Sequence, residues 1–217
     1  MRIAVLGTGV VGTTLGTALV RSGHDVRLGS RTAGHEKSMA WVAETGDHAS
    51  QGTFADAAAW AEVVVNATGG LVSLEALTAA GADNLAGKAL LDISNPLDFS
   101  GGFPPSVQQQ DGHSIGEQIQ SAFPTAKVVK TLNTMTAAVM TAPRSLPGAH
   151  TVFVAGDNAE AKELAGLLLQ GFGWAEDEIV DVGAITAARG LELYLPLWLS
   201  LMGSLGTPTF NVRVVRP

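Results

Sequence analysis

The sequence predicts an α/β fold in which a doubly wound parallel sheet is followed by a small C-terminal α-helical/mixed domain. Short apolar runs alternate with helical segments along the chain, as strand–helix–strand units require. The composition agrees, because 46% of the 217 residues are hydrophobic and 15% are charged, and parallel strands are buried on both faces. We place the domains at residues 1–142 and 143–217, since Pro143 and Pro147 punctuate the chain there.

The N-terminal part is predicted to hold five strands with helices between them. The strands precede Gly7 and lie at residues 24–28, 62–68, 89–94 and 126–130; the helices lie at 10–22, 35–44, 56–60, 73–80 and 114–123. Ligands of such sheets bind outside the carboxyl ends of the strands. Those ends are residues 7–12, 29–31, 67–70, 94–96 and 131–135. Residues 97–113 look irregular and form either a lid over the site or a plain surface loop.

The C-terminal part is predicted to add strands at 150–157 and 177–182, with a helix between them that Asn158 caps. A long apolar helix is expected from about Ala187 to Leu205, with an extended piece at 210–215. Residues 191–205 are apolar nearly all round, so this helix must be buried on more than one face. We expect a homodimer interface there, the alternative being full burial within one subunit.

Three glycines follow the first strand with the spacing of a dinucleotide-binding turn. Gly7, Gly9 and Gly12 fit G-x-G-x-x-G, directly after an apolar run and directly before a helical one. The first permits the tight turn, the second lets the backbone approach a pyrophosphate, and the third lets the helix pack against the strand. The motif therefore predicts a Rossmann-type domain. A tight turn without a ligand is the alternative.

The end of the second strand favours NADP(H) over NAD(H). An acidic residue usually stands there to bind the ribose 2′-hydroxyl of NAD, whereas an arginine accommodates the 2′-phosphate of NADP. This chain has Ser30 and Arg31, with Lys37 following. A hydroxyl and a guanidinium can bond a phosphate that a carboxylate would repel. Ordinary solvated charges are the alternative for Arg31 and Lys37.

Composition excludes several classes of function. The net charge of −7 and the lack of a Lys/Arg cluster argue against nucleic acid as a partner. The absence of cysteine removes disulfides and thiolate chemistry, and we expect no metal site. No signal peptide or long apolar span is visible, so we expect a cytoplasmic protein with no membrane partner.

The sequence lacks the common constellations for acid–base or nucleophilic catalysis. H-E-x-x-H, a Walker A loop and G-x-S-x-G are missing, and Tyr194 is the sole tyrosine. A dinucleotide site without an evident proton donor indicates hydride transfer between two cofactor-like rings. The protein would then supply orientation and electrostatics.

Several blocks of the chain resemble the NADPH:coenzyme F420 oxidoreductase family. The resemblance covers nearly the whole chain and is carried by residues 7–12, Gly29-Ser30-Arg31 with Lys37, Ser94-Asn95-Pro96-Leu97, Lys130-Thr131-Leu132-Asn133-Thr134-Met135, Gly156-Asp157-Asn158, residues 188–192 and Gly206-Thr207. It implies a dinucleotide domain for NADP and a small C-terminal domain over the cleft in which the deazaflavin stacks on the nicotinamide. The same fold occurs in membrane metalloreductases, where a flavin takes the hydride.

The resemblance also implies roles for individual residues. For the cofactor, these are Gly7, Thr8, Gly9, Val10, Val11 and Gly12 at the pyrophosphate, Ser30, Arg31 and Lys37 at the 2′-phosphate, Ala67, Thr68 and Gly69 along the ribose and linking groups, and Asn95 and Thr134 nearby. Asn133 and Met135, with Thr134 between them, would border the nicotinamide and the acceptor ring, and Leu205, Gly206 and Thr207 would close the acceptor pocket. Asn133 is expected to position and polarise the acceptor ring without exchanging protons. The archaeal deazaflavin reductases have histidine in its place.

The predicted function is hydride transfer between NADP(H) and coenzyme F420. Two alternatives remain at this stage. One is an NADPH-dependent reductase of a flavin or a small carbonyl compound, and the other is a non-catalytic NADP-binding sensor. The acceptor contacts are expected to be apolar and backbone groups, which leaves the acceptor itself open.

Overall fold

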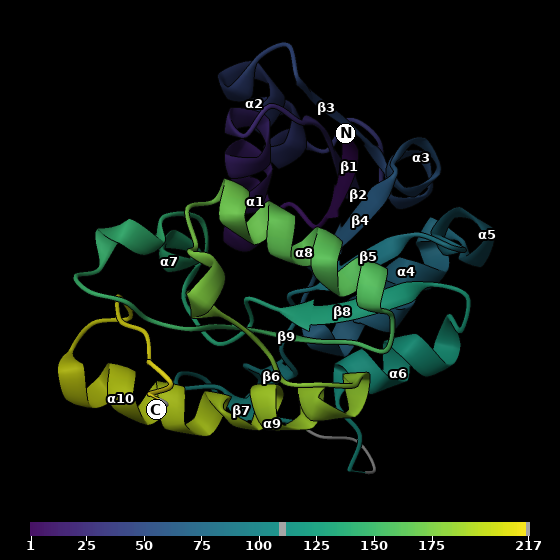
Figure 1. Cartoon of the computed structure of the whole chain (residues 1–217). Coiled ribbons are helices and arrows are strands. Elements are labelled where there is room, and N and C mark those ends of the chain that lie inside the picture. Colours follow the sequence, from purple (N-terminus) through teal and green to yellow (C-terminus); the bar gives the residue numbers. More distant parts are fainter. Residues whose placement is uncertain (109–111, 216–217) are drawn as a thin grey trace.

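A computed structural model describes residues 1–108 and 112–215 as one eight-stranded sheet with helices on both faces (Figure 1). The strands are β1 (Arg2–Leu6), β2 (Asp25–Ser30), β3 (Ala49–Thr53), β4 (Val63–Asn66), β5 (Ala89–Asp92), β8 (Lys127–Thr131), β9 (Val152–Ala155) and β10 (Ile179–Asp181). A separate two-stranded hairpin joins β6 (Leu97–Asp98) and β7 (Ser106–Val107).

Ten α-helices connect and cover the strands within the described part of the chain. They are α1 (Val10–Arg21), α2 (Glu36–Thr45), α3 (Phe54–Trp60), α4 (Ser73–Ala80), α5 (Ala82–Leu85), α6 (Ile115–Ala122), α7 (Ala137–Thr141), α8 (Ala159–Gly171), α9 (Ala188–Leu193) and α10 (Leu195–Leu205). Short 3-10 turns add η1 (Gly70–Val72), η2 (Pro143–Ser145), η3 (Glu176–Glu178) and η4 (Ile185–Ala187).

The order of the strands confirms the predicted Rossmann-type fold class. Six parallel strands follow the order β3-β2-β1-β4-β5-β8, and the order reverses between β1 and β4. Such a reversal is the point at which doubly wound sheets bind their ligands. The sheet is not wholly parallel, because β9 runs antiparallel to β8. After β8, the chain passes through the short α7 and η2 and enters β9 from the same end of the sheet. It does not cross over to the other end, so β9 runs opposite to β8.

The C-terminal residues extend the sheet. β9 pairs with β8, and β10 pairs with β9, so the sheet continues without a break across residue 143. The helix predicted for residues 187–205 is two helices, α9 and α10, which meet at Tyr194. Pro196 explains this break, because proline has no N–H to donate within a helix. The extended piece predicted at 210–215 contacts the edge of the sheet, where Thr151 N donates to Val212 O.

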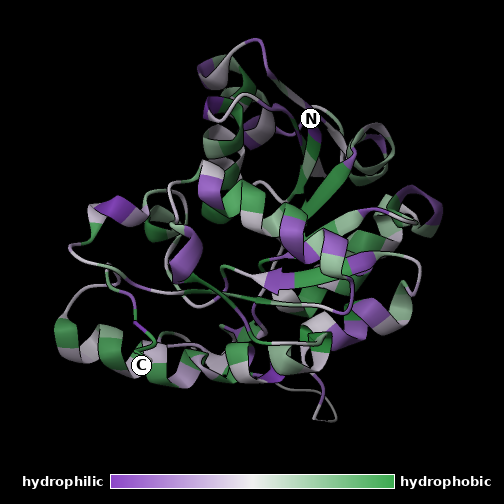
Figure 2. Ribbon diagram, viewed as in Figure 1, coloured by the Kyte–Doolittle hydropathy of each residue, from purple (hydrophilic) through white to green (hydrophobic). Residues whose placement is uncertain are grey.

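Two apolar clusters hold the helices to the sheet. Side chains of α1, α2, α7 and α8 pack on one face, and those of α3, α4, α5 and α6 pack on the other. The strands between them carry most of the buried apolar residues, and the middle of the sheet is largely green in Figure 2. α9 and α10 lie beyond the sheet, next to α6 and the β6–β7 hairpin (Figure 1). Leu195 is the one residue of α10 that is buried.

A lysine is completely buried at the carboxyl end of β8. Lys130 Nζ donates to Asp92 Oδ2 of β5 at 2.8 Å and lies 2.7 Å from Glu192 Oε1 of α9. It also donates to Ser94 O at 2.5 Å. Glu192 in turn accepts from the free N–H groups of Ile115 and Gly116 in the first turn of α6. One buried ammonium thus joins β5, β8, α6 and α9.

The charge of this lysine depends on its two carboxylate partners. Burial lowers the pKa of Lys130, but the attraction of Asp92 and Glu192 outweighs it and raises that pKa above its ordinary value. Because the pKa of Lys130 is higher in the folded chain than in the unfolded chain, its protonation stabilises the fold. This stabilisation is full at any pH below the pKa of the unfolded chain, and it is lost only as the pH rises through the pKa of the folded chain. Lys130 therefore stays charged throughout the physiological range.

We predict that Lys130→Met lowers the free energy of unfolding by about 3–5 kcal/mol, because it leaves two buried carboxylates without their cation. Lys127→Met is the matched control. Lys127 lies on the same strand, but its ion pair with Glu160 is exposed, and such a pair contributes less than about 1 kcal/mol. Urea unfolding of both variants tests this. Equal losses in the two variants would contradict it.

Candidate functional site

A cleft of about 410 Å³ lies at the carboxyl ends of β1, β4, β5 and β8. It contains nine of the residues predicted from the sequence: Gly9, Val10, Val11, Ala67, Thr68, Gly69, Asn95, Asn133 and Met135. Its other lining residues are Ile93, Ser94, Leu97, Phe99, Thr136, Ala137, Met140, Leu195 and Trp198. Four separate stretches of the chain and one C-terminal helix therefore form one site.

The glycine-rich turn forms one end of the cleft. Gly7 has a φ of 121°, and a Cβ there would lie 2.6 Å from Ala67 O, so the turn requires glycine. A Cβ at Gly12 would lie 2.2 Å from Gly7 O, which is why α1 can pack so close to β1. A Cβ at Gly9 would meet nothing within 4 Å. Gly9, which lines the cleft, thus leaves the space beside it open.

The N-terminus of α1 suits an anion. Gly9 caps the helix without a side-chain hydrogen bond, and its first turn holds no acidic residue. The first N–H groups of a helix have no partners within it, and its dipole places positive charge there. Val10 is 76% exposed at this end. Together with the space at Gly9, this end of α1 can hold the phosphate groups of a dinucleotide.

The predicted 2′-phosphate residues follow β2. Arg31 lines a second hollow of about 240 Å³ together with Thr68, Phe54 and Val72, so it lies beside the glycine end of the cleft. Lys37 is exposed at the start of α2. Within the part of the chain that the structure describes, neither cation has a carboxylate partner. Ser30 is buried, and its hydroxyl donates to Thr32 O, so in this conformation its proton is already used.

Asn95 and Asn133 hold each other across the other end of the cleft. Asn95 Nδ2 donates to Asn133 O at 2.7 Å, and Asn133 Nδ2 donates to Asn95 Oδ1 at 3.0 Å. Asn133 Nδ2 also donates to Leu191 O of α9 at 3.1 Å. Leu132, just before Asn133, has a φ of 60°, a left-handed conformation that is costly for a leucine. The backbone turns sharply there and places Asn133 between β5 and α9.

A polar network connects the buried lysine to the cleft floor. Asp92 accepts from Asn66 Nδ2 and from the N–H and hydroxyl of Ser94. Asn66 Oδ1 accepts from the Thr68 hydroxyl at 2.6 Å. Ser94 and Thr68 both line the cleft. The charge on Lys130 therefore fixes the floor of the site from beneath.

Several predicted residues lie outside the cleft lining. Gly7, Thr8 and Gly12 belong to the glycine-rich turn, Ser30, Arg31 and Lys37 belong to the end of β2 and the residues after it, and Thr134 is buried. Leu205 is the exposed last residue of α10, and Gly206 and Thr207 follow it. Leu195 and Trp198, earlier on that helix, border the cleft in their place. Sequence reasoning missed both, because an apolar helix gives no signal for which of its residues face a ligand.

The hairpin β6–β7 lies within the segment predicted as an irregular loop. Leu97 and Phe99, at its start, line the cleft, and Phe99 is 58% exposed. Part of the predicted loop, residues 109–111, lies outside the described residues. The described part does border the site.

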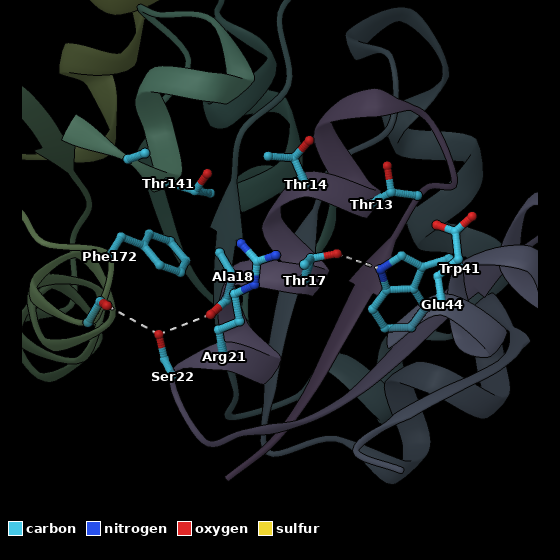
Figure 3. Close-up of a pocket in the computed structure, with 12 residues that line it drawn as sticks. Thr13, Thr14, Thr17, Ala18, Arg21, Ser22, Trp41, Glu44, Thr141 and Phe172 are labelled. Carbon is cyan, nitrogen blue, oxygen red and sulfur yellow. Dashed lines mark hydrogen bonds between the residues drawn. The ribbon is translucent and has the colours of Figure 1, made fainter. Parts of the chain in front are cut away.

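A larger hollow of about 490 Å³ lies on the outer side of α1 (Figure 3). It is lined by polar side chains of α1, including Thr13, Thr14 and Arg21, and by Trp41, whose Nε1 donates to Thr17. None of the residues predicted for the site lines it. It also lies against helices and not at strand ends, where doubly wound sheets bind ligands.

The cleft lining contains no ionisable side chain among the described residues. Its polar groups are hydroxyls, the amides of Asn95 and Asn133, and the indole of Trp198. Such a site can orient and desolvate a ligand, but it offers no acid or base. The arrangement suits a reaction in which bound cofactors carry the chemistry.

Fold and site together define a dinucleotide-dependent oxidoreductase, and comparisons with known proteins agree. A family model described as "NADP oxidoreductase coenzyme F420-dependent" matches residues 2–96. A crystal structure from Arthrobacter sp. FB24, provisionally named an F420-dependent NADP reductase, is 50% identical over the full length of both chains, with a TM-score of 0.93. The chain belongs to the F420-dependent NADP oxidoreductase family.

More distant relatives share parts of this arrangement. Rat metalloreductase STEAP3 is 32% identical over 206 residues, which cover 91% of this chain and 38% of the rat protein. An imine reductase from Streptomyces aurantiacus is 17% identical with a TM-score of 0.65, covering 95% of this chain and 64% of the enzyme, a likeness in fold alone. Across the described residues, every helix is too short or too polar to cross a membrane.

Proposed function

We propose that this protein transfers a hydride between NADP(H) and the deazaflavin coenzyme F420. The observation that carries the proposal is a single cleft with an anion-binding turn at one end and, among its described lining residues, no ionisable side chain at the other. Family membership supports an NADP-dependent oxidoreductase, and the name of the Arthrobacter relative supports the acceptor.

The cofactor fits the residues at the glycine end. The open space at Gly9 and the uncapped start of α1 would hold the pyrophosphate. Arg31 and Lys37, which have no carboxylate partner among the described residues, would hold the 2′-phosphate. Ser30 would join them only if its hydroxyl turned away from Thr32. Ala67, Thr68 and Gly69 lead from the turn to the rest of the cleft, along the path of the linking groups.

At the other end of the cleft, the protein positions the rings and excludes water. NADPH supplies the hydride when bound. Met135, Met140 and Leu195 present apolar walls, and apolar walls around the bound rings would keep water away from the hydride. Asn95 and Asn133 hold each other in place, so the site is organised before a ligand enters.

A flavin is the second candidate acceptor. The observation in its favour is the similarity to the rat metalloreductase, of which this chain spans about two fifths. The cleft lining includes the aromatic rings of Phe99 and Trp198, which suit either a deazaflavin or a flavin. The choice between coenzyme F420 and a flavin as acceptor therefore requires an activity assay with both.

We predict that Arg31→Ala weakens NADPH binding by about 1.5–3 kcal/mol, the scale of a hydrogen bond to a charged group. NADH binding should hardly change, because NADH lacks the 2′-phosphate. Arg21→Ala is the control, since Arg21 lies at the far end of α1 and outside the cleft. Titration of each variant with both cofactors tests this, and equal losses for NADPH and NADH would remove the argument.

We predict that the purified protein reduces F420 with NADPH, and that deuterium at the transferred position of NADPH appears in reduced F420 under single turnover. Direct transfer requires this, because a hydride that passes from one ring carbon to the other does not exchange with solvent. Parallel reactions with FMN and FAD test the second candidate. Reduction of a flavin but not of F420 would reverse the choice of acceptor, and loss of the label to solvent, with exchange from the product controlled for, would exclude direct transfer.

We also propose that α10 forms a homodimer interface. Leu197 and Leu205 are more than half exposed on this helix, although it is almost entirely apolar, and such a surface marks an interaction site. Light scattering at micromolar concentration should give about twice the 22.3 kDa mass of the chain. Leu197→Glu should shift it to the monomer. A monomeric mass for the unaltered protein would refute the dimer.

A further inference from the structure

The side-chain amide of Asn133 has both of its N–H bonds committed to the protein. One donates to Asn95 Oδ1 at 3.0 Å and the other to Leu191 O at 3.1 Å. A primary amide nitrogen has two donors, so no N–H of Asn133 remains for a ligand. This result conflicts with the expectation that Asn133 polarises the acceptor ring, because polarising a carbonyl needs a donor.

The direction of both asparagine amides is determined by backbone carbonyls, which can only accept. Asn95 faces Asn133 O, so its nitrogen must lie on that side and its oxygen on the other. That oxygen and Leu191 O both face the nitrogen of Asn133. Exchanging oxygen and nitrogen in either side chain would place acceptors against acceptors. The oxygen of Asn133 is therefore fixed as the atom left over.

Asn133 Oδ1 has no hydrogen-bond partner, although the residue is 2% exposed and lines the cleft. Buried acceptors are normally paired, and an exception needs an explanation. Trp198, another residue that lines the cleft, also has a buried polar atom without a partner, the donor Nε1–H. One unpaired acceptor and one unpaired donor together match a ligand that carries both an N–H and a carbonyl group.

We propose that Asn133 is a specificity-determining residue whose Oδ1 accepts a hydrogen bond from the carboxamide N–H₂ of the nicotinamide ring. This inference rests on the proposed use of NADP(H). The order of the strands supports it: the 2′-phosphate residues follow β2 and the glycine turn follows β1. A dinucleotide that begins at this side must extend toward β4, β5 and β8. Asn133 follows β8, at the nicotinamide end of that path.

The wild-type protein and three cofactors give the first test. NADP⁺ and its thionicotinamide analogue both keep the N–H₂ group, whereas the 3-acetylpyridine analogue replaces it with a methyl group. Titration calorimetry should show that the first two bind alike and that the third binds about threefold to tenfold more weakly, the range expected for one net hydrogen bond. These are affinities, so they do not depend on the acceptor or on turnover.

The second test removes the acceptor oxygen. In Asn133→Ala, the preference for NADP⁺ over the acetylpyridine analogue should disappear, while the analogue keeps its wild-type affinity to within about twofold. Asn133→Leu, closer in size to asparagine, serves if the alanine variant does not fold. Asn84→Ala is the matched control, because the Asn84 amide donates to Ala80 O far from the cleft, and it should keep the full preference.

The outcomes separate this inference from the proposed function. If the wild-type protein binds NADP⁺ and the acetylpyridine analogue equally, or if the preference survives in both Asn133 variants, Asn133 does not read the carboxamide, although NADP(H) use stands. If no NADP⁺ binds at all, the proposed function itself fails. Loss of the preference in the Asn133 variants, with the Asn84 variant unchanged, supports the inference.

Discussion

The buried ammonium of Lys130 is the constraint on which the site depends. A charge removed from water must be paired, and this one takes its partners from β5 and α9, which lie far apart in the sequence. The position of α9 is therefore set by an ion pair as well as by apolar packing. Glu192 also fixes the position of α6, because its carboxylate accepts hydrogen bonds from the first N–H groups of that helix. These donors help to offset the negative charge of Glu192, the second carboxylate of the cluster.

The same ammonium fixes two sides of the cleft. Through Ser94 O it holds the segment that carries Asn95. Through Glu192 it holds α9, where the neighbouring Leu191 supplies the carbonyl that Asn133 Nδ2 needs. Asn95 and Asn133 then meet because the segment that carries Asn95 and the helix that bonds Asn133 are both held by Lys130 Nζ. The left-handed backbone at Leu132 is tolerated because this surrounding structure determines it.

Local patterns predicted most of the fold, since their causes are local. Gly7 and Gly12 are each required by close backbone contacts within one turn, and the buried strands are apolar runs. β3 was missed because Ser50 and Gln51 interrupt any apolar alternation. The reversal at β9 and the partners of Lys130 depend on long-range contacts, which leave no mark on the residues near them. For the same reason the sequence placed Asn133 in the site but not the direction of its amide.

The two ends of the cleft recognise their ligands by different physics. The glycine end offers helix N–H groups and, just beyond it, the cations Arg31 and Lys37, which can hold phosphate charge in a chain of net charge −7. The other end is neutral throughout its described lining, because every charge near it is paired below the floor. A neutral site cannot select by charge, so it must select by shape and by the polarity of single hydrogen bonds. The direction of one amide, set by buried carbonyls and a buried lysine, leaves Asn133 Oδ1 as the acceptor that we propose for the nicotinamide carboxamide.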